Sequence, residues 1–268
     1  MAIDFHDPAG AGTYSGRTAD ATWREAVSGL VDVAGADVVD LGCGGGTYVR
    51  ALADLGAASV VGVDSSAPIL ERARAEHGSL PGVALQRADA AATGLPDGCA
   101  DLVLARALVH HLDDLGPTAR EVRRILRPGG AWVVQDRTAD DVTRPAGPHH
   151  VRGLLLELAP QLLEVELARR PERAAVAAAL RGAGFTTVGT SSLEEVRRRY
   201  ADVEDYLAEI ASRTGRSILH ELDDAALARL VDGLRERLPR GPLVERDRWT
   251  LWVARVDDDV RPPPARRR

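Results

Sequence analysis

The amino-acid sequence predicts an α/β protein whose core is a doubly wound, mostly parallel sheet, with helical insertions in its C-terminal half. Short apolar strands alternate with amphipathic helices between about residues 37 and 138, which is typical of successive βα units with right-handed crossovers. A run of four glycines among the five residues 42–46 directly follows the first predicted strand. Glycines there allow a tight turn and bring backbone N–H groups close to a ligand.

The elements of this core follow one another in a regular order. Apolar runs of strand length occupy residues 38–40, 59–64, 83–87, 100–105 and 131–135. Apolar residues recur at helical spacing in 48–55, 68–76 and 118–126. Ligands of such sheets bind beyond the carboxyl ends of the strands, so residues that directly follow the strands are candidate ligand contacts.

The regular alternation stops after Asp136. The expected elements are then a loop and a broken helix at 140–170, a helix at 171–181, a strand at 185–188, a largely helical stretch at 193–238 and a last strand at 248–255. Pro160 is expected to break the first of these helices, and Ser217 and Asp223 are expected to act as N-caps. The core is thus interrupted twice by helical material, which we expect to cap the ligand face.

Composition and charge exclude several classes of function. The chain has 268 residues and a net charge of −6, and all 34 of its basic residues are arginine. An acidic chain without a basic stripe disfavours nucleic acid as a partner. The start of the chain lacks the features of a signal peptide and no apolar run approaches about 20 residues, so we expect a cytoplasmic protein without membrane insertion. Cys43 and Cys99 alone do not make a metal framework, and no metal is expected.

The glycine loop argues against a dinucleotide. The G-x-G-x-x-G fingerprint would need glycine at position 47 or 49, where Thr47 and Val49 stand. The loop instead reads D-x-G-x-G-x-G and is led by Asp40. A carboxylate there repels a pyrophosphate but attracts a ligand with an ammonium or sulfonium charge.

Asp64 is the second candidate contact. It lies 24 residues beyond Asp40, at the end of the next predicted strand. A carboxylate in this place can accept hydrogen bonds from both hydroxyls of a ribose. Taken alone, Asp64 could equally cap the helix that follows it, and its position after the glycine loop favours the ribose.

Several segments in order resemble the class I S-adenosylmethionine-dependent methyltransferases, in particular the small-molecule (type 11) group that includes the ubiquinone and menaquinone methyltransferases. The segments are VVDLGCGGGTY, VVGVDSSAPILERAR, ALQRADAAATGLPDGCADLVLARALVHHLDD and EVRRILRPGGAWVVQD, within about residues 37–136. The resemblance implies a Rossmann-like seven-stranded sheet, S-adenosyl-L-methionine as cofactor, S-adenosyl-L-homocysteine as product and a small-molecule acceptor.

The resemblance also implies a division of the chain and a set of cofactor contacts. The expected parts are an N-terminal helical segment or lid (1–36), the cofactor-binding core (37–139), a cap loop and helix (140–170), a core helix and strand (171–190), a helical insertion forming the acceptor pocket (191–242), the last core strand (243–257) and a disordered tail (258–268). The expected contacts are Asp40, Gly42, Gly44 and Arg106 on the methionine part, Asp64 on the ribose, Ser65, Ile69, Asp89 and Ala90 on the adenine, and Tyr14 from the lid.

Four histidines are candidates for chemistry. Positioning can carry most of the catalysis of an in-line methyl transfer, and a base is needed only where the acceptor atom must lose a proton. His110 and His111 follow the fourth strand, as bases or as structural residues of the loop, and resemblance favours His111. His149 and His150 suit a cap loop, a substrate contact or, least well, a metal site.

Some alternatives remain open at this point. Arg213, Arg216 and His220 could meet an acidic substrate, although a solvated helix face explains them more simply. A regulatory or scaffold protein that binds the cofactor without turnover would carry the same motifs. An NAD(P)-dependent oxidoreductase is disfavoured by Thr47 and Asp40. The acceptor, the methylated atom (oxygen, nitrogen or carbon) and a homo-oligomeric state are not decided by the sequence.

Overall fold

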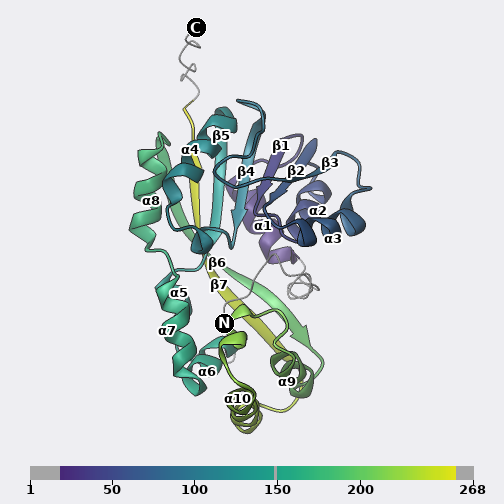
Figure 1. The fold of residues 1–268 in the computed structure, drawn as a ribbon, viewed down its shortest axis with the longest axis vertical. Coiled ribbons are helices and arrows are strands. Elements are labelled where there is room, and N and C mark those ends of the chain that lie inside the picture. Colours follow the sequence, from purple (N-terminus) through teal and green to yellow (C-terminus); the bar gives the residue numbers. More distant parts are fainter. Residues whose placement is uncertain (1–18, 148–149, 258–268) are drawn as a thin grey trace, which may run out of the picture.

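A seven-stranded sheet forms the centre of the protein, in the order β3-β2-β1-β4-β5-β7-β6 (Figure 1). The computed structural model describes residues 19–147 and 150–257. The first five strands are β1 (Asp37–Leu41), β2 (Ser59–Asp64), β3 (Val83–Arg87), β4 (Ala100–Arg106) and β5 (Leu126–Asp136). They pair in parallel, and β7 alone runs antiparallel to its neighbours. The predicted α/β fold, its doubly wound sheet and its strand number are confirmed.

Helices cover both faces of the sheet because neighbouring residues of each strand point to opposite sides. The helices are α1 (Ala21–Leu30), α2 (Thr47–Asp54), α3 (Ala67–His77), α4 (Leu115–Ile125) and α8 (Arg173–Gly182). Val38 belongs to an apolar cluster with residues of α1, α2 and α3. Val39, the next residue, belongs to a second cluster with residues of α4 and α8. Together the two clusters fix the carboxyl ends of β1, β2 and β4 at one edge of the sheet.

The last two strands in the chain extend well beyond the part of the sheet that pairs with β5. They are β6 (Thr187–Tyr200) and β7 (Leu243–Arg255). β5 pairs only with residues 250–255 of β7. Residues 193–200 of β6 and 243–249 of β7 therefore pair only with each other and extend beyond the sheet. We call this part the distal ribbon, and Figure 1 shows it running toward α9 and α10.

A third apolar cluster packs the inserted helices together with the distal ribbon. These helices are α6 (Val151–Leu158), α7 (Pro160–Ala168), α9 (Val203–Ala211), α10 (Asp224–Arg237) and the 3-10 helix η3 (Ser217–Glu221). Two further short helices lie outside this cluster, α5 (Ala139–Val142) and the 3-10 helix η2 (Val109–His111), which follows β4. Pro160 separates α6 from α7, as predicted. Within the described ranges, no helix is both long and apolar enough to cross a bilayer.

The structure corrects two expectations in this region. Residues 193–200 were expected to be helical, as the start of the insertion at 191, but they form the outer half of β6. Glu195 is buried on this strand with Leu193, and an inward-facing carboxylate conceals the apolar alternation that identifies a strand. Ser217 is the first residue of η3 rather than an N-cap, whereas Asp223 caps α10 by accepting the N–H of Ala226 at 2.7 Å.

Candidate functional site

The glycine loop turns at the carboxyl end of β1 and leads into α2. Gly42, Gly44 and Gly46 all have positive φ angles, of 75°, 52° and 84°. These angles suit glycine, since a side chain is strained there. A Cβ atom added at Gly44 would meet nothing within 4 Å. The loop therefore leaves open space beside its backbone, into which a ligand can fit.

Asp64 fastens this loop to the neighbouring strand. Its Oδ2 atom accepts the Gly44 N–H at 2.9 Å, and its Oδ1 atom accepts the Ser66 N–H at 2.9 Å. Each carboxylate oxygen has capacity for a further hydrogen bond. The side chain is thus fixed at the end of β2 and can still accept from a ligand.

Asp40 is a buried carboxylate with an unused acceptor. The residue is only 2% exposed, and its Oδ2 atom has no hydrogen-bond partner within the described part of the chain. Burial, together with the charge of Asp64, raises the pKa of Asp40 to about 7, although Arg106 acts in the opposite direction. A cation placed here would satisfy the orphan oxygen and favour the ionised form. The site therefore suits the ammonium end of an amino acid.

The expected adenine contacts lie at the same edge of the sheet, beyond β2 and β3. Ser65 is exposed just after β2, while Ile69 is buried in α3. Asp89 is exposed after β3, where its Oδ1 atom accepts the Ala91 N–H at 2.7 Å, and Ala90 is half-buried beside it. These placements are compatible with an adenine pocket, and the roles of the four residues stay predictions.

Arg106 connects the core to the distal ribbon. Its Nη2 atom lies 2.8 Å from the Oε2 atom of Glu195, and its guanidinium stacks over the rings of Tyr48 and Trp249 at 4.4 and 4.2 Å. Burial disfavours the charged form of Arg106, but the combined attraction of Glu195, Tyr48 and Asp247 outweighs burial and raises the pKa. Glu195 and Trp249 are not recognisable as site residues in the sequence, because their partners are remote in the chain.

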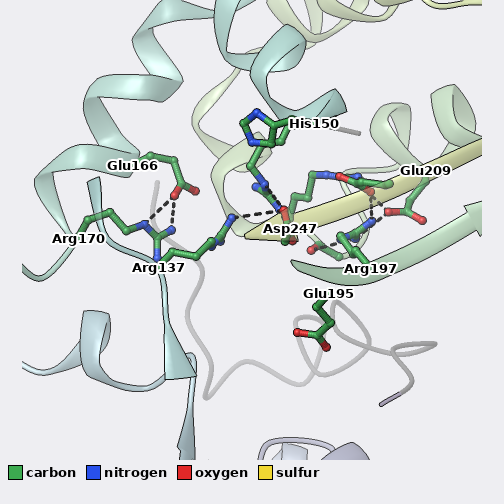
Figure 2. A network of polar contacts seen from close by, with 12 residues as sticks. Arg137, His150, Glu166, Arg170, Glu195, Arg197, Glu209 and Asp247 are labelled. Carbon is green, nitrogen blue, oxygen red and sulfur yellow. Dashed lines mark hydrogen bonds and ion pairs between the residues drawn. The ribbon is translucent and has the colours of Figure 1, made fainter. Parts of the chain in front are cut away.

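A small cavity of about 30 Å³ opens between the sheet edge and the distal ribbon. Tyr48, Arg106 and Arg137 line it from the carboxyl edge of the sheet, because they follow or end β1, β4 and β5. The other lining residues are Arg152 of α6 and Glu195, Arg197, Asp247 and Trp249 of the distal ribbon. Figure 2 shows how closely the charged side chains around it are gathered. The walls of the cavity therefore come both from the core of the sheet and from the inserted segments.

The two histidines after β4 are held differently. The Nδ1 atom of His110 lies 2.9 Å from the Oδ1 atom of Asp136, and its backbone N–H donates to Oδ2 at 3.1 Å. Burial lowers the pKa of His110 although Asp136 opposes the shift. The ring of His111 lies 4.0 Å from that of His110, and partial desolvation with the charge of His110 lowers the pKa of His111 to about 4. Neither histidine lines the described cavity.

The remaining candidates are His150, Tyr14, His149 and Cys43. His150 is buried, and its Nδ1 atom lies 3.3 Å from the carbonyl oxygen of Pro145. Tyr14 and His149 lie outside the described residues. Within the part that the structure describes, no group of three or more histidine, cysteine or acidic residues could hold a metal. Burial raises the pKa of the Cys43 thiol well above its usual range, so this cysteine is a poor nucleophile.

Arg216 corrects the expectation of a solvated helix face. It is 3% exposed, and it forms ion pairs with Glu209 at 2.6 Å and Glu245 at 2.5 Å. Arg213 donates to the carbonyl oxygen of Leu222 at 3.0 Å and pairs with Asp224, while His220 is exposed. Arg216 therefore belongs to a buried ion-pair network with Glu209 and Glu245, and Arg197 of the cavity wall pairs with the same two glutamates.

Comparisons with known proteins agree with this geometry. Residues 39–134 match the family described as methyltransferase domain. A protein of Mycolicibacterium smegmatis, named as a probable S-adenosylmethionine-dependent methyltransferase, is 31% identical over 193 residues, which cover 67% of this chain and 72% of the relative. Other curated relatives match less completely, since the aligned part spans 32% to 50% of their own length.

Solved structures share the fold over most of the chain. The S-adenosylmethionine-dependent methyltransferase of Mesorhizobium loti has 25% identity and a TM-score of 0.53, with 88% of this chain and 98% of that chain covered. Phosphoethanolamine N-methyltransferase 2 of Haemonchus contortus, solved with S-adenosyl-L-methionine, has 16% identity and a TM-score of 0.61, with 95% and 60% covered. At this identity the second likeness concerns the fold alone.

Proposed function

The chain belongs to the S-adenosylmethionine-dependent methyltransferases, and we propose that it methylates a small molecule bound at the mouth of the cavity between the sheet edge and the distal ribbon. The observation that carries the proposal is the pairing of an open glycine loop with the orphan carboxylate of Asp40. The cofactor is S-adenosyl-L-methionine, whose amino-acid end matches this arrangement in charge. The cavity begins at Tyr48 and Arg106, which directly adjoin the loop in the fold.

We assign the cofactor contacts as follows. The methionine part lies against Asp40, Gly42 and Gly44, and Arg106 closes that end of the site. Asp64 accepts hydrogen bonds from the ribose, and the adenine lies between the start of α3 and the turn after β3. This last place is formed by Ser65, Ile69, Asp89 and Ala90. The open space at Gly44 and the fixed orientation of Asp64 support the assignment.

The chain's own contribution to the reaction is mainly positioning. When bound, the cofactor supplies a methyl group on a positively charged sulfur, which the lone pair of the acceptor displaces in line while the carbon–sulfur bonding electrons stay on sulfur. The cavity walls hold the acceptor at attack distance, an effect worth about 7–11 kcal/mol in favourable models. The rigid ion pair of Arg106 with Glu195 keeps the two parts of the wall at a fixed separation.

Where the acceptor atom must lose a proton, we assign the base to His110, whose partner Asp136 directly precedes Arg137 of the cavity wall. Asp136 accepts the Nδ1–H of His110 and thereby leaves the lone pair on Nε2. The lowered pKa of His110 keeps the ring neutral near pH 7. His111 packs against the ring of His110, and its pKa is lowered to about 4, which makes it a weak base, so we assign it a structural role.

Two measurements test the proposal. Calorimetric titration should detect binding of S-adenosyl-L-methionine and S-adenosyl-L-homocysteine, and wild-type protein that binds neither would refute it. Incubation of a metabolite extract with methyl-labelled cofactor should then label at least one small molecule. Binding without any transfer would instead support the regulatory or scaffold alternative.

A further inference from the structure

Three of the four arginines that line the cavity are paired with carboxylates at hydrogen-bond distance. Arg106 is held by Glu195 at 2.8 Å. Arg152 forms a bidentate pair with Asp247, with distances of 2.7 and 3.1 Å. The third, Arg197, is shared between two buried glutamates of the network, Glu209 at 2.8 Å and Glu245 at 2.7 Å. Each of these three guanidiniums therefore has at least one carboxylate within hydrogen-bond distance.

Arg137, the fourth, has no such partner. Its side chain is 12% exposed, and the carboxylate nearest to it in the described network is Asp247, at 3.9 Å. Asp247 is already held by Arg152, and Figure 2 shows Arg137 reaching toward this occupied pair. The Nε and Nη1 atoms of Arg137 form no hydrogen bond within the described ranges. The cavity wall thus presents a buried cation whose donors are unused.

The surroundings of Arg137 increase this deficit of negative charge. Burial and the charges of Arg152 and Arg170 together lower the pKa of Arg137 to about 9, against Glu166 and Asp247. Glu166 is already hydrogen-bonded by Arg170 and accepts no hydrogen bond from the Nε or Nη1 atom of Arg137. One face of Arg137 packs over the ring of Trp249 at 5.1 Å. The Nε and Nη1 atoms of Arg137 are buried without a hydrogen bond among the described residues, and Arg137 lines the cavity.

We propose that Arg137 binds a carboxylate of the acceptor, so that the substrates of this methyltransferase are small carboxylic acids. A guanidinium matches a carboxylate in shape as well as in charge. An isolated buried charge is unfavourable, and an incoming anion removes that cost. The inference rests on the proposed function, because it names the substrate class of the same site.

The carboxylate of the cofactor is the other possible source of the anion. Arg106 is the arginine whose charge acts on Asp40, at the methionine end of the cofactor site. Arg137 instead is flanked by Arg152 and Asp247, which come from α6 and the distal ribbon. This position favours the acceptor over the cofactor as the source of the carboxylate. The two sources can be distinguished, because Arg137→Gln should weaken the binding of S-adenosyl-L-homocysteine only if Arg137 binds the carboxylate of the cofactor.

Binding of simple acids tests the proposal directly. Protein saturated with S-adenosyl-L-homocysteine is titrated with malonate, succinate, citrate and benzoate, and with their amides. We expect at least one acid to bind about tenfold more tightly than its amide. The Arg137→Gln substitution should weaken the binding of that acid by about tenfold or more. Arg137→Lys should retain part of the affinity, because lysine keeps the positive charge but lacks the planar, two-pronged set of N–H donors of a guanidinium. Arg235→Gln, an exposed variant on α10, serves as the control.

The contrary outcomes are equally specific. The proposal would be overturned if no acid bound better than its amide. It would also be overturned if the Arg137→Gln variant bound the preferred acid with an affinity within about twofold of the wild type. A comparable loss of S-adenosyl-L-homocysteine affinity in Arg137→Gln would reassign the anion to the cofactor. Wild-type protein that does not bind S-adenosyl-L-homocysteine would refute the proposed function itself.

Stability separates a ligand-binding arginine from a structural one. Arg137→Met removes an unpaired buried charge, so we expect the free variant to unfold at the wild-type temperature or above it. Arg152→Met should unfold at a lower temperature, since it leaves Asp247 without its bidentate partner. A destabilised Arg137→Met variant would show that the arginine serves the fold and would contradict the proposal.

Discussion

Asp64 accepts the backbone N–H of Gly44 at 2.9 Å and so joins the end of β2 to the glycine loop. The other oxygen of the same carboxylate accepts the N–H of Ser66, at the start of α3. One side chain therefore fixes the shape of the loop and the direction of the following helix. A ribose that binds to Asp64 meets a carboxylate whose orientation is set in advance, and little conformational freedom remains to be lost on binding.

We predict that Asp64→Ala weakens binding of S-adenosyl-L-methionine by more than about 1 kcal/mol, the scale of a lost hydrogen bond to a charged acceptor. It should also lower the unfolding temperature, because two backbone N–H groups lose their acceptor. Calorimetry and thermal unfolding measure the two effects. Asp54→Ala, an exposed change on α2 with similar chemistry, should leave affinity unaltered. Unchanged affinity in Asp64→Ala would refute the ribose assignment.

We also predict that binding of the cofactor depends on pH through Asp40. The raised pKa of about 7 means that the folded protein keeps a proton that the unfolded chain loses near pH 4. The free energy of unfolding should therefore fall as the pH rises from about 4 to 7 on account of this group. A bound ammonium requires the ionised carboxylate, so affinity should rise about tenfold per pH unit up to about pH 7.

The matched variant for this test is Asp40→Asn, which has no titrating group. Calorimetric titrations of S-adenosyl-L-homocysteine between about pH 6 and 8, roughly one unit either side of the raised pKa of about 7, should give a steep slope below pH 7 for the wild type and a shallow one for Asp40→Asn. An equal slope in both proteins would show that Asp40 does not govern binding.

The sequence predicted the core well because its signals are local. The strands from β1 to β5 each contain a short apolar run, and the turn at Gly44 needs a residue type that the sequence displays directly. Asp40 and Asp64 are candidates in the sequence because a strand end places the next side chain at the ligand edge. All of these features depend on neighbours within a few residues.

The acceptor side could not be predicted in the same way. Glu195 meets Arg106 across 89 residues of the chain, and Arg152 meets Asp247 across 95. No local pattern records such pairs, and the buried charges made the distal ribbon look like exposed helix. Arg137 drew no attention because its distinguishing property is the lack of a partner, which only the folded arrangement reveals.

Glu195 gives a stability prediction for this part of the fold. It accepts from Tyr48 at 2.7 Å and from Gln135 at 2.9 Å, besides pairing with Arg106. Glu195→Ala leaves the buried Arg106 charge unpaired, which should cost about 3–5 kcal/mol of unfolding free energy. Its neighbour Glu194 forms an exposed pair with Arg144, and Glu194→Ala should cost less than about 1 kcal/mol. Denaturant unfolding of both variants measures the difference, and equal costs would contradict it.

The histidine assignment gives the last prediction. His110→Ala should lower kcat by about 10² to 10⁴ when the acceptor atom must release a proton, because Asp136 orients the ring of His110. The affinity of this variant for S-adenosyl-L-homocysteine should stay within about twofold of the wild type. His111→Ala should keep most of the rate, since the lowered pKa of about 4 makes His111 a weak base.

The pH profile tests the same assignment independently. The pKa of His110 is lowered, so the neutral base persists at neutral pH and kcat should fall only as the pH drops below the usual histidine range. Asp136→Asn removes the charge that opposes the desolvation of His110, so the acid limb should move to lower pH. A His110→Ala enzyme with the wild-type rate would leave positioning as the whole of catalysis. A large loss in His111→Ala alone would transfer the base to His111.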